Sequence, residues 1–132
     1  MRLLLVDDSS LMRKATRLAF PGGKYDLEEA ENGFGALAQL SLSQKPFDVI
    51  VLDLQMPDMN GPEFIQALRQ RPLHRDTPIV VATSETEESP LLQEVRRLGV
   101  SAILRKPWKP QELAAAVQAA AAARRPGKPP RP

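Results

Sequence analysis

Three acidic residues, one hydroxyl residue and one lysine each follow a short run of apolar residues in this sequence. They are Asp7, Asp8, Asp53, Thr83 and Lys106. Carboxylates that converge repel one another, and a hard cation with oxygen ligands, such as Mg²⁺, relieves that repulsion. A carboxylate can act as a nucleophile toward phosphorus, while a hydroxyl and an ammonium group hold the phosphoryl oxygens. The set therefore indicates Mg²⁺-assisted phosphoryl transfer, with Asp53 as the acceptor because it follows the most apolar run.

Each of these residues alone has an ordinary structural explanation. A single Asp at the end of a strand usually belongs to a turn or a helix cap, and a lone Thr or Lys there is more often structural still. The chemical interpretation depends on all five side chains meeting at one edge of one sheet. The elements that position them must therefore be predicted first.

Five apolar runs alternate with five segments of helical periodicity. The runs predicted as strands cover residues 3–6, 27–30, 47–52, 79–82 and 101–104. This alternation predicts an α/β fold: a doubly wound, five-stranded parallel sheet with right-handed crossovers, flavodoxin-like, with strand order 2-1-3-4-5. The crevice of that topology lies beyond the carboxyl ends of strands 1 and 3, where Asp7, Asp8 and Asp53 stand.

The spacing of apolar residues also predicts the inner faces of the helices. The first helix, capped by Ser9 or Ser10, is expected to bury Leu11, Ala15 and Leu18. The second is expected to bury Leu37 and Leu40, with Phe34 as a further candidate.

Two side chains with polar nitrogens are judged separately. His74 is predicted to be an exposed loop residue without a catalytic role. For Trp108, partial burial and contact with a partner protein are equally compatible with the sequence.

Composition and charge narrow the class of protein. The chain has 132 residues, 42% of them hydrophobic and 26% charged, which is typical of one globular domain. Residues 124–132 hold four of the 18 basic residues and none of the 16 acidic ones, so residues 1–123 carry a net charge of −2. We expect a domain over 1–123 and a disordered, basic, Pro-rich tail over 124–132, without direct nucleic-acid binding.

Cysteine is absent, which fits a reducing cytoplasm. No run approaches the roughly 18 uncharged apolar residues that a membrane span needs. A cytoplasmic protein without a membrane partner is therefore expected.

Four stretches together resemble the receiver domain of bacterial response regulators. They read Leu-Leu-Val-Asp7-Asp8-Ser-Ser, Val-Ile-Val-Leu-Asp53-Leu-Gln-Met-Pro57-Asp-Met-Asn-Gly61, Val-Val-Ala-Thr83-Ser and Arg105-Lys106-Pro107. The resemblance covers residues 1 to about 123, and its nearest type is the single-domain, chemotaxis-regulator (CheY-like) form. Each stretch is weak alone, and the set is specific.

The resemblance implies roles for individual residues. Asp53 would accept a phosphoryl group from a phosphohistidine on a sensor histidine kinase or phosphotransfer protein. Asp8 and Asp53 would bind Mg²⁺ directly, together with the backbone carbonyl of Gln55, while Asp7 would act through water. Thr83 and Lys106 would hold the phosphoryl group, and the Lys106-Pro107 bond would be cis. The protein would catalyse only its own phosphorylation and dephosphorylation, and would signal by altered contacts with an unknown downstream protein.

The sequence departs from the family at one position. Ile103 stands where the family often has Tyr or Phe, three residues before the strand-5 lysine, so the aromatic part of the family's switch is in doubt. Gln55 and Glu85 occupy variable positions that tune dephosphorylation in such proteins.

Other interpretations stay open at this point. A degenerate receiver could act as a phosphorylation-independent interaction module, and the chain could be the receiver part of a larger response regulator. A haloacid-dehalogenase-type phosphatase is disfavoured because Asp53-Leu54-Gln55 lacks the Asp-x-Asp motif. A dinucleotide or flavin protein is disfavoured because no Gly-x-Gly-x-x-Gly follows the first strand.

Overall fold

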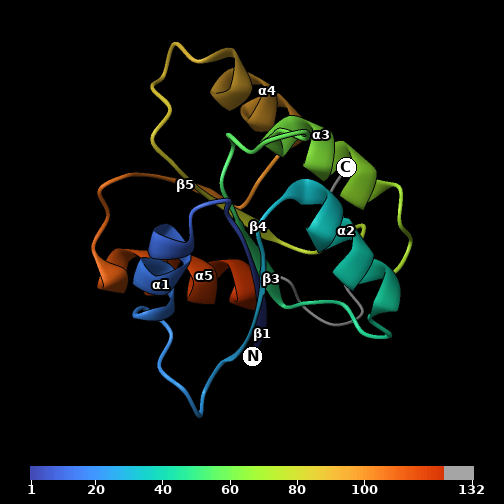
Figure 1. Ribbon diagram of the computed structural model, residues 1–132. Helices are drawn as coiled ribbons and strands as arrows, with labels where there is room; N and C mark the ends of the chain where they lie inside the picture. Colours follow the sequence, from blue (N-terminus) through green and yellow to red (C-terminus); the bar gives the residue numbers. More distant parts are fainter. Residues whose placement is uncertain (124–132) are drawn as a thin grey trace.

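A five-stranded parallel sheet forms the centre of the computed structural model, which describes residues 1–123 (Figure 1). Strands and helices alternate strictly along the chain. The strands are β1 (Arg2–Val6), β2 (Asp26–Ala30), β3 (Val49–Leu52), β4 (Ile79–Thr83) and β5 (Ala102–Arg105). The helices are α1 (Ser10–Arg17), α2 (Gly33–Leu42), α3 (Gly61–Arg69), α4 (Pro90–Leu98) and α5 (Pro110–Ala123).

The order of the strands in the sheet is β2-β1-β3-β4-β5, with every pair parallel. This confirms the predicted doubly wound, flavodoxin-like fold. Strand β1 pairs with β2 on one side and with β3 on the other, so the winding reverses next to β1. The carboxyl ends of β1 and β3 are therefore neighbours, as the sequence predicted.

Both faces of the sheet are covered by helices. Helices α2, α3 and α4 lie on one face and α1 and α5 on the other, as Figure 1 shows. Alternate residues of the central strands enter the two cores: Leu4 and Ile50 face α2–α4, whereas Leu3 and Val51 face α1 and α5. This two-sided burial explains why the strands read as continuous apolar runs.

Local signals define where the helices begin and end. The side chain of Ser9 caps α1 by accepting a hydrogen bond from the backbone N–H of Met12 (3.2 Å). Asn60 and Glu63 form a reciprocal capping box at the start of α3. Gly99 closes α4 with a φ of 88°, a value that L side chains rarely adopt.

The predicted inner face of α1 is wrong at Leu11 and Leu18, whereas Ala15 is partly buried. Leu11 is 74% exposed and Leu18 is 78% exposed, whereas Thr16, Ala19 and Phe20 are buried. The helix ends at Arg17, and the turns after it direct Ala19 and Phe20 into the core. Apolar spacing failed here because the helix is short and its polar Thr16 lies on the buried side.

Phe34 is also exposed, at 56%, so it is not part of the inner face of α2, although Leu37 and Leu40 are. Phe34 lies in the first turn of α2, where Gly33 rather than Phe34 packs under Met59.

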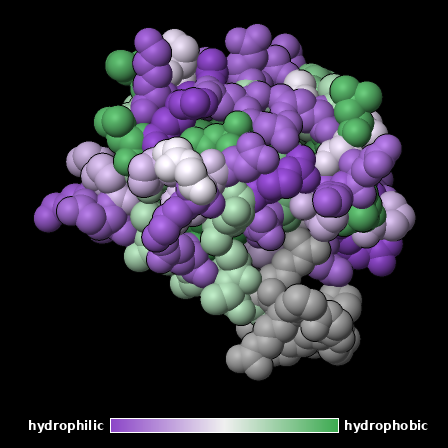
Figure 2. All heavy atoms as spheres, turned by 90° about the horizontal axis from the view of Figure 1, so that it is seen from below, coloured by the Kyte–Doolittle hydropathy of each residue, from purple (hydrophilic) through white to green (hydrophobic). Residues whose placement is uncertain are grey.

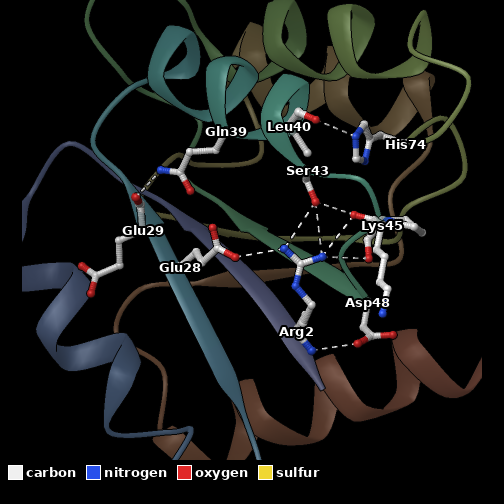
Figure 3. A network of polar contacts seen from close by, with 10 residues as sticks. Arg2, Glu28, Glu29, Gln39, Leu40, Ser43, Lys45, Asp48 and His74 are labelled. Atoms are coloured by element: carbon white, nitrogen blue, oxygen red, sulfur yellow. Dashed lines mark hydrogen bonds and ion pairs between the residues drawn. The ribbon is translucent and has the colours of Figure 1, made fainter.

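The predicted exposure of His74 is wrong as well, because this loop residue is only 3% exposed. Its Nε2 lies 2.9 Å from the carbonyl oxygen of Leu40, near the end of α2 (Figure 3). Since the acceptor is a carbonyl, Nε2 donates this bond. The histidine therefore joins the loop before β4 to helix α2, and no sequence pattern had shown this contact.

Arg2 lies in a polar network at the amino ends of the strands, opposite the edge where Asp7, Asp8 and Asp53 lie. Its guanidinium bonds to Glu28, Ser43 and the carbonyl of Lys45 (Figure 3). The guanidinium carbon also lies 4.2 Å from the ring centroid of Phe47. These contacts link β1, β2 and the segment before β3. They stabilise the sheet at its amino ends.

The predicted tail, residues 124–132, lies outside the described residues. Within residues 1–123, no helix is long and apolar enough to cross a membrane. The face seen in Figure 2 is largely hydrophilic, with groups of hydrophobic residues between the polar ones.

The contact of His74 leads to a stability prediction. His74→Ala should lower the free energy of unfolding by about 1–3 kcal/mol, because it removes a buried hydrogen bond and leaves space in the core. Arg75→Ala, at the exposed neighbouring position, should change it by less than about 0.5 kcal/mol. Urea denaturation of both variants measures the difference, and equal small effects would show that the His74 contact contributes nothing.

Candidate functional site

Strands β1 and β3 deliver two aspartates side by side. Val6 pairs with Leu52 in the parallel register, and the N–H of Asp53 donates to the carbonyl of Val6 (2.9 Å). Asp7, which follows Val6, therefore stands next to Asp53. The topology of the sheet brings residues 46 positions apart in sequence to one place.

Three carboxylates form a cluster at this edge. Ligand oxygens of Asp7, Asp8 and Asp53 all lie within 4.8 Å of one another. Asp53 is buried, Asp7 is half-buried and Asp8 is exposed, so the cluster opens from the sheet toward solvent. Three convergent carboxylates with one open side match the oxygen ligands that Mg²⁺ prefers, so the residues present fit a magnesium ion.

Lys106 brings a positive charge to the cluster from β5. Its Nζ lies 3.5 Å from Oδ2 of Asp7 and 3.8 Å from Oδ1 of Asp53. The lysine side chain is 18% exposed, so solvent screens these ion pairs only in part. The Lys106-Pro107 peptide bond is cis, as the family resemblance implied.

Thr83 ends β4 beside the lysine. The N–H of Lys106 donates to the carbonyl of Thr83 (2.8 Å), and the threonine side chain is buried. Its hydroxyl accepts a hydrogen bond from the N–H of Glu85 (3.0 Å). The hydroxyl is thus held by its own loop, while Lys106 already contacts the acidic cluster.

The loop after Asp53 is tightly folded. The N–H of Gly61 donates to the carbonyl of Leu54, and a Cβ at Gly61 would lie 2.5 Å from a methyl carbon of Leu54. Asp58 adopts a φ of 70° within this turn. Gln55 is exposed at the start of the loop, two residues beyond Asp53.

Burial raises the pKa of Asp53 from 3.8 to about 6, and the negative charge of Asp7 adds to this effect. Lys106 and the N–H of Leu54, which donates to Oδ1 of Asp53 (2.9 Å), oppose it. A carboxyl group with a pKa of about 6 is mainly ionised at pH 7. The carboxyl group of Asp53 is therefore mainly charged at pH 7, although its environment disfavours the charge.

Four of the predicted site residues come together directly: Asp7, Asp8, Asp53 and Lys106. The other two lie at the same edge of the sheet, Thr83 at the end of β4 and Gln55 in the loop after β3, and no side-chain hydrogen bond or ion pair joins them to the cluster within residues 1–123. All six residues thus lie at the carboxyl edge of the sheet. Their chemical roles remain predictions.

Sequence reasoning missed three residues that line a small pocket with Asp7, Asp53 and Lys106. They are Arg13, Thr16 and Trp108. The indole Nε1 of Trp108 is buried and has no hydrogen-bond partner within residues 1–123. Arg13 stands in α1 near Lys14 and Arg17, and nothing in the sequence distinguishes the one that faces inward.

The raised pKa of Asp53 predicts a pH-dependent stability. The folded protein binds this proton more tightly than the unfolded chain, so the resulting stabilisation is full below about pH 4 and lost as pH rises through about 6. Asp53→Asn removes the titration. Its free energy of unfolding, compared with that of the wild type without Mg²⁺, should increase between pH 4 and 7 by at most about 3 kcal/mol.

Denaturant unfolding at a series of pH values measures this difference. Asp58→Asn is the control, because Asp58 is exposed and Asn tolerates its positive φ. A difference that does not change with pH for Asp53→Asn would contradict the raised pKa.

Comparison with known proteins identifies the family of this chain. Residues 3–118 match the response regulator receiver domain family. A chemotaxis protein CheY homolog of Campylobacter jejuni is 36% identical over 118 residues, covering 86% of this chain and 86% of the relative. The transcriptional regulatory protein ResD of Bacillus subtilis is 32% identical, over 89% of this chain but 47% of ResD.

A solved structure of the chemotaxis protein CheY4 of Vibrio cholerae has the same fold. It is 36% identical, with a TM-score of 0.79, over 90% of this chain and 97% of that one. Together with the acidic cluster at the ends of β1 and β3, these findings establish the family: the chain belongs to the response regulator receiver domains and is a CheY-like receiver of two-component signalling.

Proposed function

We propose that this receiver is a Mg²⁺-dependent phosphorylation switch in which Asp53 accepts a phosphoryl group from a phosphohistidine. The donor would be a sensor histidine kinase or a phosphotransfer protein. The output would be altered contacts with a downstream protein. The observation that carries this proposal is the meeting of Asp53 with two further carboxylates and one ammonium group at one edge of the sheet.

The transfer step follows from the site. A carboxylate oxygen of Asp53 attacks phosphorus, the bond from phosphorus to the donor nitrogen breaks, and an acyl phosphate forms as the imidazole leaves. Lys106 is within 3.8 Å of Asp53 and is placed to take up charge on a phosphoryl oxygen. Asp53 is mainly ionised at pH 7, so it needs no general base.

Asp7, Asp8 and Asp53 would hold the metal ion, with the backbone carbonyl of Gln55 as a further ligand. When bound, Mg²⁺ offsets the charge of the carboxylates and of the incoming phosphoryl oxygens. Asp53 then presents its carboxylate at the buried end of the cluster. The other two carboxylates, closer to solvent, orient the site around it.

The readout would begin at Thr83. Its hydroxyl accepts a hydrogen bond from the N–H of Glu85, and it would leave this position to reach a phosphoryl group on Asp53. A movement of that kind shifts the population between two packings of the loop and of the neighbouring surface of α4, β5 and α5. Ile103, partly buried on β5, is aliphatic, so this relay would work without an aromatic side chain.

The similarity to CheY proteins and to ResD supports a role in either of two settings. The CheY homolog matches over most of its length, whereas ResD matches over less than half. Receivers of this kind therefore occur with and without additional sequence. The proposal concerns the switch itself and holds for both settings, whereas a degenerate receiver would act without phosphate.

Labelling tests the acceptor. Wild-type protein with Mg²⁺ and a small phosphodonor such as acetyl phosphate should gain one phosphoryl group, and Asp53→Asn should gain none because the amide is not a nucleophile. Intact-protein mass spectrometry measures the gain in mass. Asp58→Asn is the control and should be labelled like the wild type. Labelling of Asp53→Asn would show that another residue is the acceptor. A folded wild type without any label would favour the degenerate receiver.

Mg²⁺ should also stabilise the folded protein, because it binds the folded cluster and relieves carboxylate repulsion. At ten times its dissociation constant the gain is about 1.4 kcal/mol, or a rise in Tm of about 5 °C. The double variant Asp8→Ala with Asp53→Ala should lose the shift, whereas Asp58→Asn with Asp76→Asn, at exposed sites, should keep it.

Thermal unfolding with and without Mg²⁺, at matched ionic strength, measures these shifts. An equal shift in the wild type and in the Asp8/Asp53 double variant would place the bound metal elsewhere.

A further inference from the structure

Arg13, in the first turns of α1, contacts Asp7 from the side of the pocket. Its Nη1 donates to the backbone carbonyl of Asp7 at 2.5 Å, and its Nε donates to Oε1 of Glu29 at 2.9 Å. The Arg13 side chain is only 15% exposed. Neither the strand-end pattern nor the family motifs include this arginine.

These contacts close a ring of three interactions around the end of β1. The N–H of Asp7 donates to the carbonyl of Ala30, at the end of β2. Glu29, the preceding residue of β2, binds Arg13, and Arg13 returns to the carbonyl of Asp7. Both backbone groups of Asp7 are therefore held, one by β2 and the other by α1.

The carboxylate of Asp7 is also held in place. Its Oδ1 accepts a hydrogen bond from the N–H of Ser9 (2.9 Å), and its Oδ2 faces Lys106. Ser9 in turn caps α1, the helix that carries Arg13. The short segment between β1 and α1 is thus fastened at its backbone and at its side chain.

We propose that Arg13 is a positioning residue for the metal site and that, together with Glu29, it holds Asp7 in its ligand position before the ion arrives. The inference rests on the proposed Mg²⁺ site. Its physical basis is pre-organisation: a segment that is already ordered loses less conformational entropy when it binds an ion. Groups that hydrogen-bond to metal-binding residues commonly change metal affinity in this way.

Removal of Arg13 should change the affinity for Mg²⁺ in opposite directions, depending on whether the arginine acts by holding Asp7 or through its charge. A guanidinium close to the site repels Mg²⁺, so an arginine that acted through its charge would weaken metal binding, and its removal would strengthen it. An arginine that acts by holding Asp7 strengthens metal binding, and its removal weakens it. Glu29 already pairs with the Arg13 charge, which reduces the repulsive contribution.

Arg17 provides a matched control within the same helix. It also binds Glu29, through Oε2, but its side chain is 49% exposed and it makes no contact with Asp7 within residues 1–123. Arg17→Gln and Arg13→Gln remove the same charge from the same helix and the same glutamate. Only Arg13→Gln opens the ring around Asp7.

Isothermal titration with MgCl₂ at constant ionic strength compares wild type, Arg13→Gln, Arg13→Lys and Arg17→Gln. We expect the dissociation constant for Mg²⁺ to rise about tenfold in Arg13→Gln and to change less than about twofold in Arg17→Gln. Arg13→Lys keeps the charge but cannot reproduce the two-pronged contact with Asp7 and Glu29, so an intermediate rise is expected. If Arg13→Gln proves unfolded, Arg13→Lys against Arg17→Lys is the decisive pair.

Three results of this titration would overturn the proposal. One is tighter Mg²⁺ binding in Arg13→Gln, which would assign Arg13 a purely electrostatic effect. Another is equal weakening in Arg13→Gln and Arg17→Gln, and a third is an unchanged dissociation constant in both Arg13 variants.

Amide hydrogen exchange without metal separates this inference from the proposed function. The amides of Asp7 and Ser9 should exchange about tenfold faster in Arg13→Gln than in wild type, and less than about twofold faster in Arg17→Gln. If the wild type does not bind Mg²⁺, the proposed metal site is wrong, but the difference in exchange rate between Arg13→Gln and the wild type should remain. Unchanged exchange in Arg13→Gln would overturn the positioning role even if the wild type binds Mg²⁺.

Discussion

The repulsion among three carboxylates at the ends of β1 and β3 is the constraint on which the rest of this structure depends. Asp7, Asp8 and Asp53 lie within a few ångströms of one another, and Asp53 is buried. Burial of Asp53, with the negative charge of Asp7 adding to it, raises its pKa to about 6, so the ionised cluster costs stability in the absence of a cation. Lys106 offsets part of that cost with a single charge. In the proposed function, the remaining negative charge would attract a divalent ion and, through that ion, a phosphoryl group.

Carboxylates that repel one another stay together only if the surrounding structure is rigid, and elements on both sides of the cluster hold it in place. Strands β1 and β3 are buried on both faces, which fixes the spacing of Asp7 and Asp53. The loop after Asp53 closes over Leu54 at Gly61, where a larger residue would collide. On the other side, α1 and β2 hold the backbone of Asp7 through Arg13 and Ala30. By contrast, the hydroxyl of Thr83 is held only by the N–H of Glu85, in the loop after β4, so this side chain is the mobile partner in the proposed switch.

Several features could be predicted from the residues because they depend on local patterns. Continuous apolar runs identify strands buried on both faces, and their alternation with helical segments identifies a parallel sheet. The strand order then follows from the few topologies available, and with it the meeting of Asp7 and Asp53. Predictions about single faces were less successful. Leu11 and Leu18 have apolar side chains at helical spacing and yet are exposed, because the orientation of α1 is set by its contacts with the sheet.

Only the tertiary structure decided the contacts between elements that lie far apart in sequence. The burial of His74 depends on the position of Leu40 in α2, and the choice of Arg13 over Lys14 or Arg17 depends on where α1 lies against β2. Charge and hydropathy do not encode these choices, since three basic residues in one helix look alike until the helix is packed. The candidate residues of the site could be identified in the sequence because the proposed chemistry needs particular residue types at strand ends. The residues that hold the site in place could not be identified in the sequence. Any well-placed hydrogen-bond donor can do this, and the placement of a donor depends on how the elements pack.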